Sequence, residues 1–271
     1  MSVQIHPTAL VDPAAELADG VTIGPWCLIE ADVRIGAGSV LGPGVIVRSG
    51  TRLGKNNTVY QYATLGEFSQ DKKYKGEPAS LVIGDGNVIR ESCTVHRGTV
   101  NDGATGETVI GSNNLLMVNV HVAHDCVLGN DAVLANNCAL AGHVHLGDGV
   151  ILGGFTGVHQ FCRLGRLSFA GVGTVVLQDV PPFVRVIGSP ARANGLNTLG
   201  LRRAGLAEGA RLGLKKAYRA AMRGAKYEQS ALDALGDEYP AIEEFLAWMR
   251  APSRRGVVKG VCRGGVDEMG R

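Results

Sequence analysis

The sequence predicts a left-handed parallel β-helix followed by a small α-helical domain, and three observations support this fold class. Aliphatic residues recur every six positions, and small or β-branched residues recur four positions after each of them. The regularity stops after Pro181-Pro182, where a helical spacing of apolar residues begins. A short, sustained period indicates a repeat architecture, in which each unit buries its apolar side chains only by stacking on its neighbours.

The aliphatic repeat sets the register of the prism. Counting in sixes, every position from Val11 to Val59 is aliphatic, and a second run from Ile110 to Val176 departs from Ile, Leu and Val only at Ala170. The aliphatic slot and the small slot are two residues apart, so on an extended strand they face the same side. Gly, Asn and Asp at the remaining slots suit corners. Three hexads therefore close one triangular turn of eighteen residues, and about eight turns stack roughly 4.8 Å apart, an exception to the usual right-handed crossover.

The pattern divides the chain into three segments. Residues 1–190 should form the prism, interrupted by polar loops at about 67–81 and 100–109. Residues 191–252 have helical spacing and should form an α-helical C-terminal domain. Residues 253–271 are rich in Gly and Arg, and we expect a disordered tail there.

Composition excludes several classes of function. The net charge is only +2, which does not suggest nucleic-acid binding, and no apolar run reaches membrane-spanning length. The N-terminal residues lack the features of a signal peptide, so we expect a cytoplasmic protein. Five cysteines fall in the inward slot, where reduced thiols act as small apolar side chains and suit a reducing compartment. These are Cys27, Cys93, Cys126, Cys138 and Cys162.

The histidines point the opposite way. Residues eighteen apart lie on successive turns, so one outward corner collects most of the histidines, together with an acid and an amide. The set is His96, His121, His124, Asp125, His143, His159 and Gln160, with His96 included if the loops skip no hexad. Such a cluster could be a solvated corner, a zinc site between subunits, or a histidine general base held by a carboxylate. The adjacency of Asp125 to His124 favours the base.

The chain resembles the UDP-N-acetylglucosamine acyltransferase family that begins lipid A synthesis, over roughly residues 5–256. The resemblance rests on the motifs HPTA (6–9), QDKKYKGEP (70–78), IRESCTVHRGT (89–99), NVHVAHDCVLGN (119–130), LANNCALAGHV (134–144), GVHQFCRLG (157–165) and QDVPPFV (178–184). It implies a homotrimer with active sites between neighbouring prisms. It also implies transfer of a 3-hydroxyacyl chain, carried on the phosphopantetheine of acyl carrier protein, to the glucosamine 3-hydroxyl, without a cofactor or metal.

The resemblance also implies roles for individual residues. His124 would be the general base, Asp125 would orient it, and the backbone N–H of Gly142 would stabilise the oxyanion. The substrate-binding residues would be Asp71, Lys73, His96, His121, His143, His159 and Gln160 around the sugar and acyl oxygen, and Asn197 and Arg203 at the nucleotide. Phe169 and Val172 would measure the acyl chain, and a valine in place of the family's glycine predicts a shorter chain.

Departures from the family pattern keep alternatives open. Leu199 and Ala204 stand where the family has a Glu and a second Arg, so nucleotide contacts should differ. N-acylation of a 3-amino UDP-sugar stays possible, as do a zinc-dependent trimeric lyase and a non-catalytic trimeric scaffold. The segment from Arg202 to Lys226 contains eight Lys and Arg residues and one acid, Glu208. This excess predicts either a solvated helix face or a docking surface for the acidic carrier protein.

Overall fold

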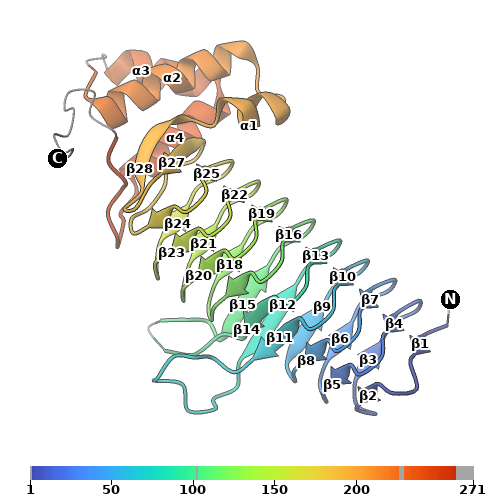
Figure 1. The fold of residues 1–271 in the computed structure, drawn as a ribbon. Helices are drawn as coiled ribbons and strands as arrows, with labels where there is room; N and C mark the ends of the chain where they lie inside the picture. Colours follow the sequence, from blue (N-terminus) through green and yellow to red (C-terminus); the bar gives the residue numbers. More distant parts are fainter. Residues whose placement is uncertain (1, 102, 226–228, 261–271) are drawn as a thin grey trace, which may run out of the picture.

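The structure is a computed structural model that describes residues 2–101, 103–225 and 229–260. Figure 1 shows a triangular prism built of short strands, with the helices gathered at the end remote from the N-terminus. Three parallel sheets form its faces, with eleven, nine and eight strands in the described residues. The left-handed parallel β-helix predicted from the hexad repeat is confirmed.

Each face takes every third strand of the chain. Sheet A contains β1 (Gln4–Ile5), β4 (Thr22–Ile23), β7 (Val40–Leu41), β10 (Thr58–Val59), β13 (Val88–Ile89), β16 (Leu115–Leu116), β19 (Val133–Leu134), β22 (Ile151–Leu152), β25 (Phe169–Ala170), β27 (Val184–Ile187) and β28 (Arg192–Leu196). Sheet B contains β2 (Leu10–Val11), β5 (Leu28–Ile29), β8 (Ile46–Val47), β11 (Thr64–Glu67), β14 (Thr94–His96), β17 (His121–Val122), β20 (Ala139–Leu140), β23 (Gly157–Val158) and β26 (Val175–Val176). Sheet C contains β3 (Glu16–Leu17), β6 (Arg34–Ile35), β9 (Thr51–Leu53), β12 (Ser80–Ile83), β15 (Glu107–Ile110), β18 (Val127–Leu128), β21 (His145–Leu146) and β24 (Arg163–Leu164).

The strands pair with the spacing that the repeat predicts. His121 lies beside Ala139, and Ala139 lies beside Gly157, so residues eighteen apart are neighbours on successive turns. The aliphatic and small slots together fill the interior of the prism, where Val122, Leu140 and Val144 are fully buried. Since no turn can bury these side chains alone, the stack is stabilised as a whole.

The inward cysteines confirm the register. All five that the repeat places inside are buried, and Cys126 Sγ donates a hydrogen bond to the carbonyl oxygen of Ala141 at 3.2 Å. Burial raises the pKa of the Cys126 thiol to about 12, so this thiol carries no nucleophilic thiolate near neutral pH. The sixth cysteine, Cys262, lies outside the described residues.

Both loops leave the prism at the same corner, between sheets B and C, which we call the B–C edge. The first joins β11 to β12 and spans residues 68–79, and the second joins β14 to β15 and spans residues 97–106. Glu77 on the first accepts a hydrogen bond from Asn101 on the second at 2.9 Å. The two loops therefore project from one edge and support each other there (Figure 1).

The helices follow the antiparallel pair β27–β28. They are α1 (Thr198–Arg203), α2 (Glu208–Arg223), α3 (Gln229–Glu238) and α4 (Pro240–Arg250). Ile242 and Phe245 of α4 are fully buried, as is Leu214 of α2. No helix within the described ranges is long and apolar enough to cross a membrane.

The prediction of a disordered tail from Ser253 is wrong for residues 253–260, which run back along the prism as a strap. Asp179, fully buried, accepts hydrogen bonds from Ser253 Oγ at 2.8 Å and from the Arg163 guanidinium at 2.9 Å. Its backbone pairs with the strap through Gly256 and Val258. Composition failed here because backbone pairing to the last turn, which is insensitive to side chain, fixes this segment. Residues 261–271 lie outside the described residues.

Candidate active site

A groove of about 900 Å³ runs along the B–C edge. It is open to one side and crosses several turns of the prism, so it can hold an extended ligand. Its lining comes from the first loop, from three consecutive corners and from the strap: Gln70, Asp71, Lys72, Lys73, His121, Ala123, His124, Ala139, Leu140, Ala141, Gly142, Gly157, Val158, His159, Gln160, Phe161, Val175, Leu177 and Arg254.

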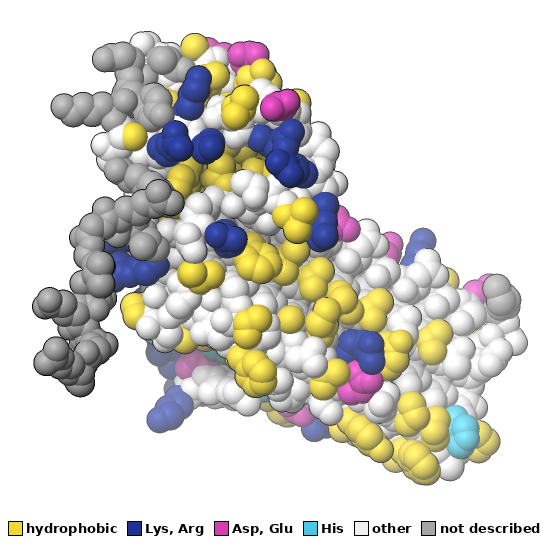
Figure 2. Space-filling model, turned by 45° about the horizontal axis from the view of Figure 1, so that its top comes forward, with side chains coloured by type: hydrophobic (Ala, Val, Ile, Leu, Met, Phe, Trp, Pro, Cys, Tyr) yellow, Lys and Arg dark blue, Asp and Glu magenta, His cyan; other side chains and the backbone are white. Residues whose placement is uncertain are grey.

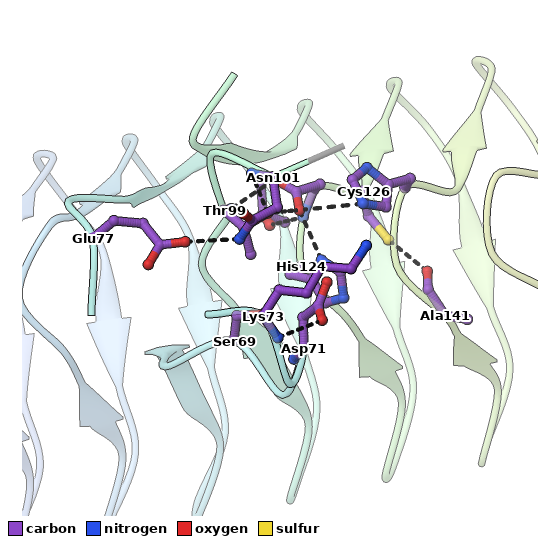
Figure 3. A network of polar contacts seen from close by, with 12 residues as sticks. Ser69, Asp71, Lys73, Glu77, Thr99, Asn101, His124, Cys126 and Ala141 are labelled. Carbon is purple, nitrogen blue, oxygen red and sulfur yellow. Dashed lines mark hydrogen bonds and ion pairs between the residues drawn. The ribbon is translucent and has the colours of Figure 1, made fainter. Parts of the chain in front are cut away.

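His124 and Asp125 form a bonded pair on the floor of this groove. His124 Nδ1 lies 2.7 Å from Asp125 Oδ2, and both side chains are largely buried. Thr99, on the second loop, donates to the same carboxylate twice, from its backbone N–H to Oδ1 at 2.7 Å and from its hydroxyl to Oδ2 at 2.8 Å. Thr99 on the second loop therefore holds the Asp125 carboxylate in place, and this carboxylate in turn orients His124 (Figure 3).

The pair settles which nitrogen of His124 is free to react. A carboxylate accepts hydrogen bonds, so the proton of a neutral imidazole sits on Nδ1 and leaves a lone pair on Nε2. Nε2 faces Gly142 on the next turn: a Cβ placed at Gly142 would lie 2.6 Å from it. Glycine is thus required at 142 by the approach of the ring. None of the described residues accepts a hydrogen bond from the Gly142 N–H, so this donor is available to a ligand.

His143 lies on the next turn and stands edge-on to His124, with ring centroids 5.2 Å apart. Its Nε2 lies 3.7 Å from Asp125 Oδ2, and its other side stacks on Phe161, with centroids 4.5 Å apart. Asp125, His143 and Phe161 all have positive φ, but so do residues at many other corners of the prism. The left-handed backbone here is a property of the corners and does not by itself indicate function.

His121 and His96 form a second histidine pair, one turn apart, with ring centroids 5.1 Å apart. His121 lines the groove and its Nδ1 shares a hydrogen bond with Thr94 Oγ1 at 2.8 Å. Burial, helped by the neighbouring His96 and His124 rings, lowers the pKa of His121 to about 4. Burial also lowers the pKa of His96, which lies behind His121 and does not line the groove. His121 is therefore an uncharged hydrogen-bonding group at neutral pH.

The structure brings most of the expected site residues together. Asp71 and Lys73 reach the groove from the first loop, beside His124 (Figure 3), and His159 and Gln160 line it two turns above. His159 Nδ1 donates to the Gln160 carbonyl oxygen at 3.2 Å. One end of the groove thus presents several hydrogen-bonding groups around His124.

Four expected residues lie elsewhere in the chain. Asn197 is 8% exposed and acts as the N-cap of α1, accepting from Gly200 N and donating to the Leu167 carbonyl oxygen. Arg203 is exposed on the same helix and does not line the groove. Phe169 lies on β25 of sheet A, and Val172 lies at the corner between sheets A and B, the A–B edge, across sheet B from the groove. Within one chain these four do not share a cavity with His124.

The site also offers a set of atoms that could hold a metal. Ligand atoms of His124, Asp125 and His143 lie within 4.8 Å of one another. The Asp125 carboxylate, however, already accepts hydrogen bonds from both donors of Thr99, and His124 Nδ1 is bonded to it. A metal bound there would have to replace some of these bonds.

Three residues that act in or on the groove were missed in the sequence. Thr99 anchors Asp125 from a loop, where the hexad count no longer applies. Phe161 could have been found, because it lies eighteen residues after His143 in the same corner column. Arg254 lies on the strap, and its guanidinium carbon is 3.5 Å from the centre of the Phe161 ring.

Comparisons with known proteins agree with this arrangement. Residues 179–258 match the family model described as UDP-N-acetylglucosamine O-acyltransferase, domain 2, and residues 107–142 match the bacterial transferase hexapeptide model. A protein of Pseudomonas putida named acyl-[acyl-carrier-protein]–UDP-N-acetylglucosamine O-acyltransferase is 50% identical, over 89% of this chain and 94% of its own length. One of the same name from Thiobacillus denitrificans is 49% identical over 94% of this chain and 99% of its own.

Solved structures of UDP-N-acetylglucosamine acyltransferases are also similar to this chain. The structure of LpxA from Acinetobacter baumannii is similar with a TM-score of 0.88 and 44% identity, covering 94% of this chain and 99% of its own. The UDP-N-acetylglucosamine acyltransferase of Francisella novicida has a TM-score of 0.88 at 36% identity, with 94% of each chain covered.

The low pKa of His121 predicts a pH dependence of stability. Between pH 6.5 and about 4 the unfolded chain binds a proton at this residue that the folded chain does not, so acidification through this window favours unfolding. His121→Asn should therefore flatten the fall in the free energy of unfolding between pH 6.5 and 4, measured by urea denaturation at a series of pH values. His6→Asn, at the far end of the prism, should keep the wild-type slope. An unchanged slope in His121→Asn would contradict the burial of a neutral imidazole.

Proposed function

The chain belongs to the acyl-[acyl-carrier-protein]–UDP-N-acetylglucosamine O-acyltransferase family, and from this membership we propose the course of the reaction in its groove. The protein is an acyltransferase that moves an acyl chain from acyl carrier protein to UDP-N-acetylglucosamine, the first step of lipid A biosynthesis. We propose that the chain is a 3-hydroxyacyl group and that its acceptor is the glucosamine 3-hydroxyl. The observation that carries the mechanism is the His124 Nδ1–Asp125 bond, which leaves Nε2 as the base.

In this mechanism His124 removes the proton of the acceptor hydroxyl as its oxygen attacks the thioester carbon. Nε2 takes the proton, and the Asp125 carboxylate stabilises the imidazolium that forms. The carbonyl oxygen becomes an oxyanion, for which the Gly142 N–H is the nearby donor. Collapse of the tetrahedral intermediate breaks the carbon–sulfur bond, and the leaving thiolate takes the proton from His124. The ring is then neutral again, and an ester and a thiol have been formed.

The sugar has hydrogen-bonding partners on both sides of this base. Asp71 and Lys73 approach from the loop, His121 lies three residues before His124 on the same turn, and His159 and Gln160 lie two turns above. The uncharged His121 can accept or donate to a hydroxyl without placing a second cation beside the His124 imidazolium. This arrangement supports a bound hexose whose attacking hydroxyl points at Nε2.

A homotrimer would complete the site. The A–B edge carries exposed apolar side chains on several of its turns: Trp26 (67%), Tyr62 (64%), Phe155 (67%) and Val172 (78%). Hydrophobic side chains also line the face of the prism seen in Figure 2. Exposed aromatic groups in such numbers indicate an interface. If the A–B edge of one subunit meets the B–C edge of the next, Phe169 and Val172 reach a neighbouring groove, where they can measure an acyl chain.

The helical end supplies a docking surface for the carrier protein. Dark-blue Lys and Arg side chains gather over the helices in Figure 2. A second hollow, of about 570 Å³ between α1, α2 and β28, is lined by Arg185, Arg202, Arg211, Lys215 and Arg219 against the single acid Glu208. Of the eight cations counted in the sequence, the side chains of Arg223 and Lys226 lie outside what the structure describes. This excess of positive charge supports docking of an acidic partner, weakened by salt.

The acceptor atom distinguishes the closest alternative. The relatives are named as O-acyltransferases, which supports a hydroxyl group as the acceptor. Leu199, which is 57% exposed on α1, departs from the family pattern, and this departure leaves a 3-amino sugar as the alternative acceptor. Faster transfer to the 3-amino analogue than to UDP-N-acetylglucosamine would favour N-acylation.

Replacement of His124 tests the proposed base. His124→Gln should lower kcat about 10²–10⁴-fold with little change in KM, since a general base contributes in the transition state. The measurement is transfer of a hydroxyacyl chain from acyl carrier protein to UDP-N-acetylglucosamine. His145→Gln is the matched control, because His145 lies on sheet C outside the groove and should leave kcat near wild type. Full activity in His124→Gln would exclude this base.

Removal of metal tests the cluster of His124, Asp125 and His143. We expect exhaustive treatment with a chelator to leave the rate of acyl transfer unchanged, because the carboxylate is already held by hydrogen bonds. Loss of activity that zinc restores, together with stoichiometric zinc in the purified protein, would replace the base mechanism with a metal-dependent one.

Replacement of Val172 tests the acyl-chain ruler. Val172→Gly should shift preference toward longer hydroxyacyl donors, because each methylene newly buried adds about 0.8 kcal/mol and two add about tenfold in relative kcat/KM. Competition between donors of different length gives this ratio directly. A wild-type preference for a fourteen-carbon donor, or no shift in the variant, would contradict the assignment.

A further inference from the structure

Arg254 places a positive charge in the groove from a segment that belongs to neither the prism nor the helices. Its guanidinium carbon lies 3.5 Å from the centre of the Phe161 ring, whose other face stacks on His143. The residue lines the groove together with Gln160, Val175 and Leu177. The strap thus brings a cation to the corner two turns above His124.

The position of Arg254 is fixed by its neighbours in the strap. Ser253 Oγ donates to the buried Asp179 carboxylate at 2.8 Å, and Gly256 accepts from the Asp179 backbone at 2.8 Å. Pro252, on the other side, accepts from the Arg163 guanidinium at 2.8 Å. The strap is therefore bonded to the last turn of the prism on both sides of Arg254, which limits the conformational freedom that a ligand would have to remove.

The guanidinium has hydrogen-bonding capacity to spare. It forms neither an ion pair nor a hydrogen bond with any residue in ranges 2–101, 103–225 and 229–260. The Phe161 ring takes one face of the group, but its N–H donors point outward in the guanidinium plane. Among the groove-lining residues, Asp71 is the one acid, against Lys72, Lys73 and Arg254. A planar fork of donors in a groove with excess positive charge suits a phosphate.

We propose that Arg254 binds a phosphate group of a substrate lying in the groove, namely the diphosphate of the sugar nucleotide. The inference deepens the proposed function and rests on it for the identity of the ligand. Phe161 lies two turns above His124, a separation of about 10 Å at the spacing of parallel strands. On a glucosamine, a single ring carbon separates C3, whose hydroxyl faces Nε2, from C1, which carries the diphosphate. The side chain of Arg254, two turns from His124, can therefore reach a diphosphate on C1 of a glucosamine whose 3-hydroxyl lies at His124.

The phosphodiester of the pantetheine arm is the other source of the same chemistry. That arm is long, so a thioester held at Gly142 would place its phosphate well beyond a separation of two turns. The distance therefore favours the nucleotide, and separate titrations of the two substrates distinguish them.

The test compares three variants. Arg254→Met keeps an apolar chain on Phe161 and removes the charge, and Arg254→Lys keeps the charge without the fork. Lys259→Met is the control, since Lys259 is an exposed cation on the same strap that does not line the groove. Steady-state kinetics with each substrate varied in turn give kcat and both KM values, and calorimetric titration with UDP gives binding without turnover. Thermal unfolding checks that the strap stays folded.

In Arg254→Met we expect the KM for UDP-N-acetylglucosamine and the Kd for UDP to rise about tenfold or more, the effect of a hydrogen bond to a charged group. The kcat and the KM for the carrier protein should stay within about twofold, Arg254→Lys should recover part of the affinity, and Lys259→Met should match wild type.

A rise confined to the carrier-protein KM would overturn the nucleotide assignment, and a fall in kcat with both KM values and UDP affinity unchanged would overturn phosphate binding. If the wild type binds UDP but transfers no acyl chain, the proposed function fails while the UDP titration still tests Arg254.

Discussion

The catalytic corner depends on the backbone hydrogen bonds that hold residues eighteen apart, such as His124 and Gly142, side by side on successive turns. Because the strands are only two to four residues long within most of the prism, a turn has little stability by itself, and the register is enforced by the buried aliphatic column. A slip of one residue would exchange the inward and outward side chains of every turn above it. The constraint that forms the core therefore also sets His124 beneath Gly142 and His143 beneath Phe161.

The hexad count predicted the positions of residues within the repeat, but not those of residues in the loops and the strap. The inward position of Cys126 and the outward position of His124 follow from slot number, and both are observed. Thr99 could not be placed, because its loop has no period and its contact with Asp125 is a matter of loop conformation. The strap was misjudged for a related reason: a Gly/Arg-rich composition predicts poor burial, but Asp179 provides a buried partner more than seventy residues earlier in the chain. The contribution of Phe169 and Val172 depends on a neighbouring subunit, which the periodicity of one chain does not describe.

The groove combines two opposite electrostatic arrangements within one corner. Asp125 is buried, and its carboxylate accepts three hydrogen bonds, from the two donors of Thr99 and from His124. His121 is half-buried with a hydroxyl partner, Thr94, and other imidazoles nearby, and is held neutral. A positive charge is therefore disfavoured at His121, whereas its neighbour His124 has a carboxylate partner at 2.7 Å. Two histidines three residues apart are given different roles by what surrounds them.

The strap also has a consequence for the order in which the molecule is assembled. Its residues follow α4 and return to Asp179, so they are synthesised after the prism and the helices and dock on the last turn after it has been made. The lower part of the groove, around His124, is formed by the prism and its loops. The upper wall, to which Arg254 belongs, is complete only when the strap has docked. During synthesis the chain would thus have its base and carboxylate in place while the groove is still open at one end. Detachment of the strap in the folded protein would return the groove to that state, as a local opening that leaves the β-helix intact.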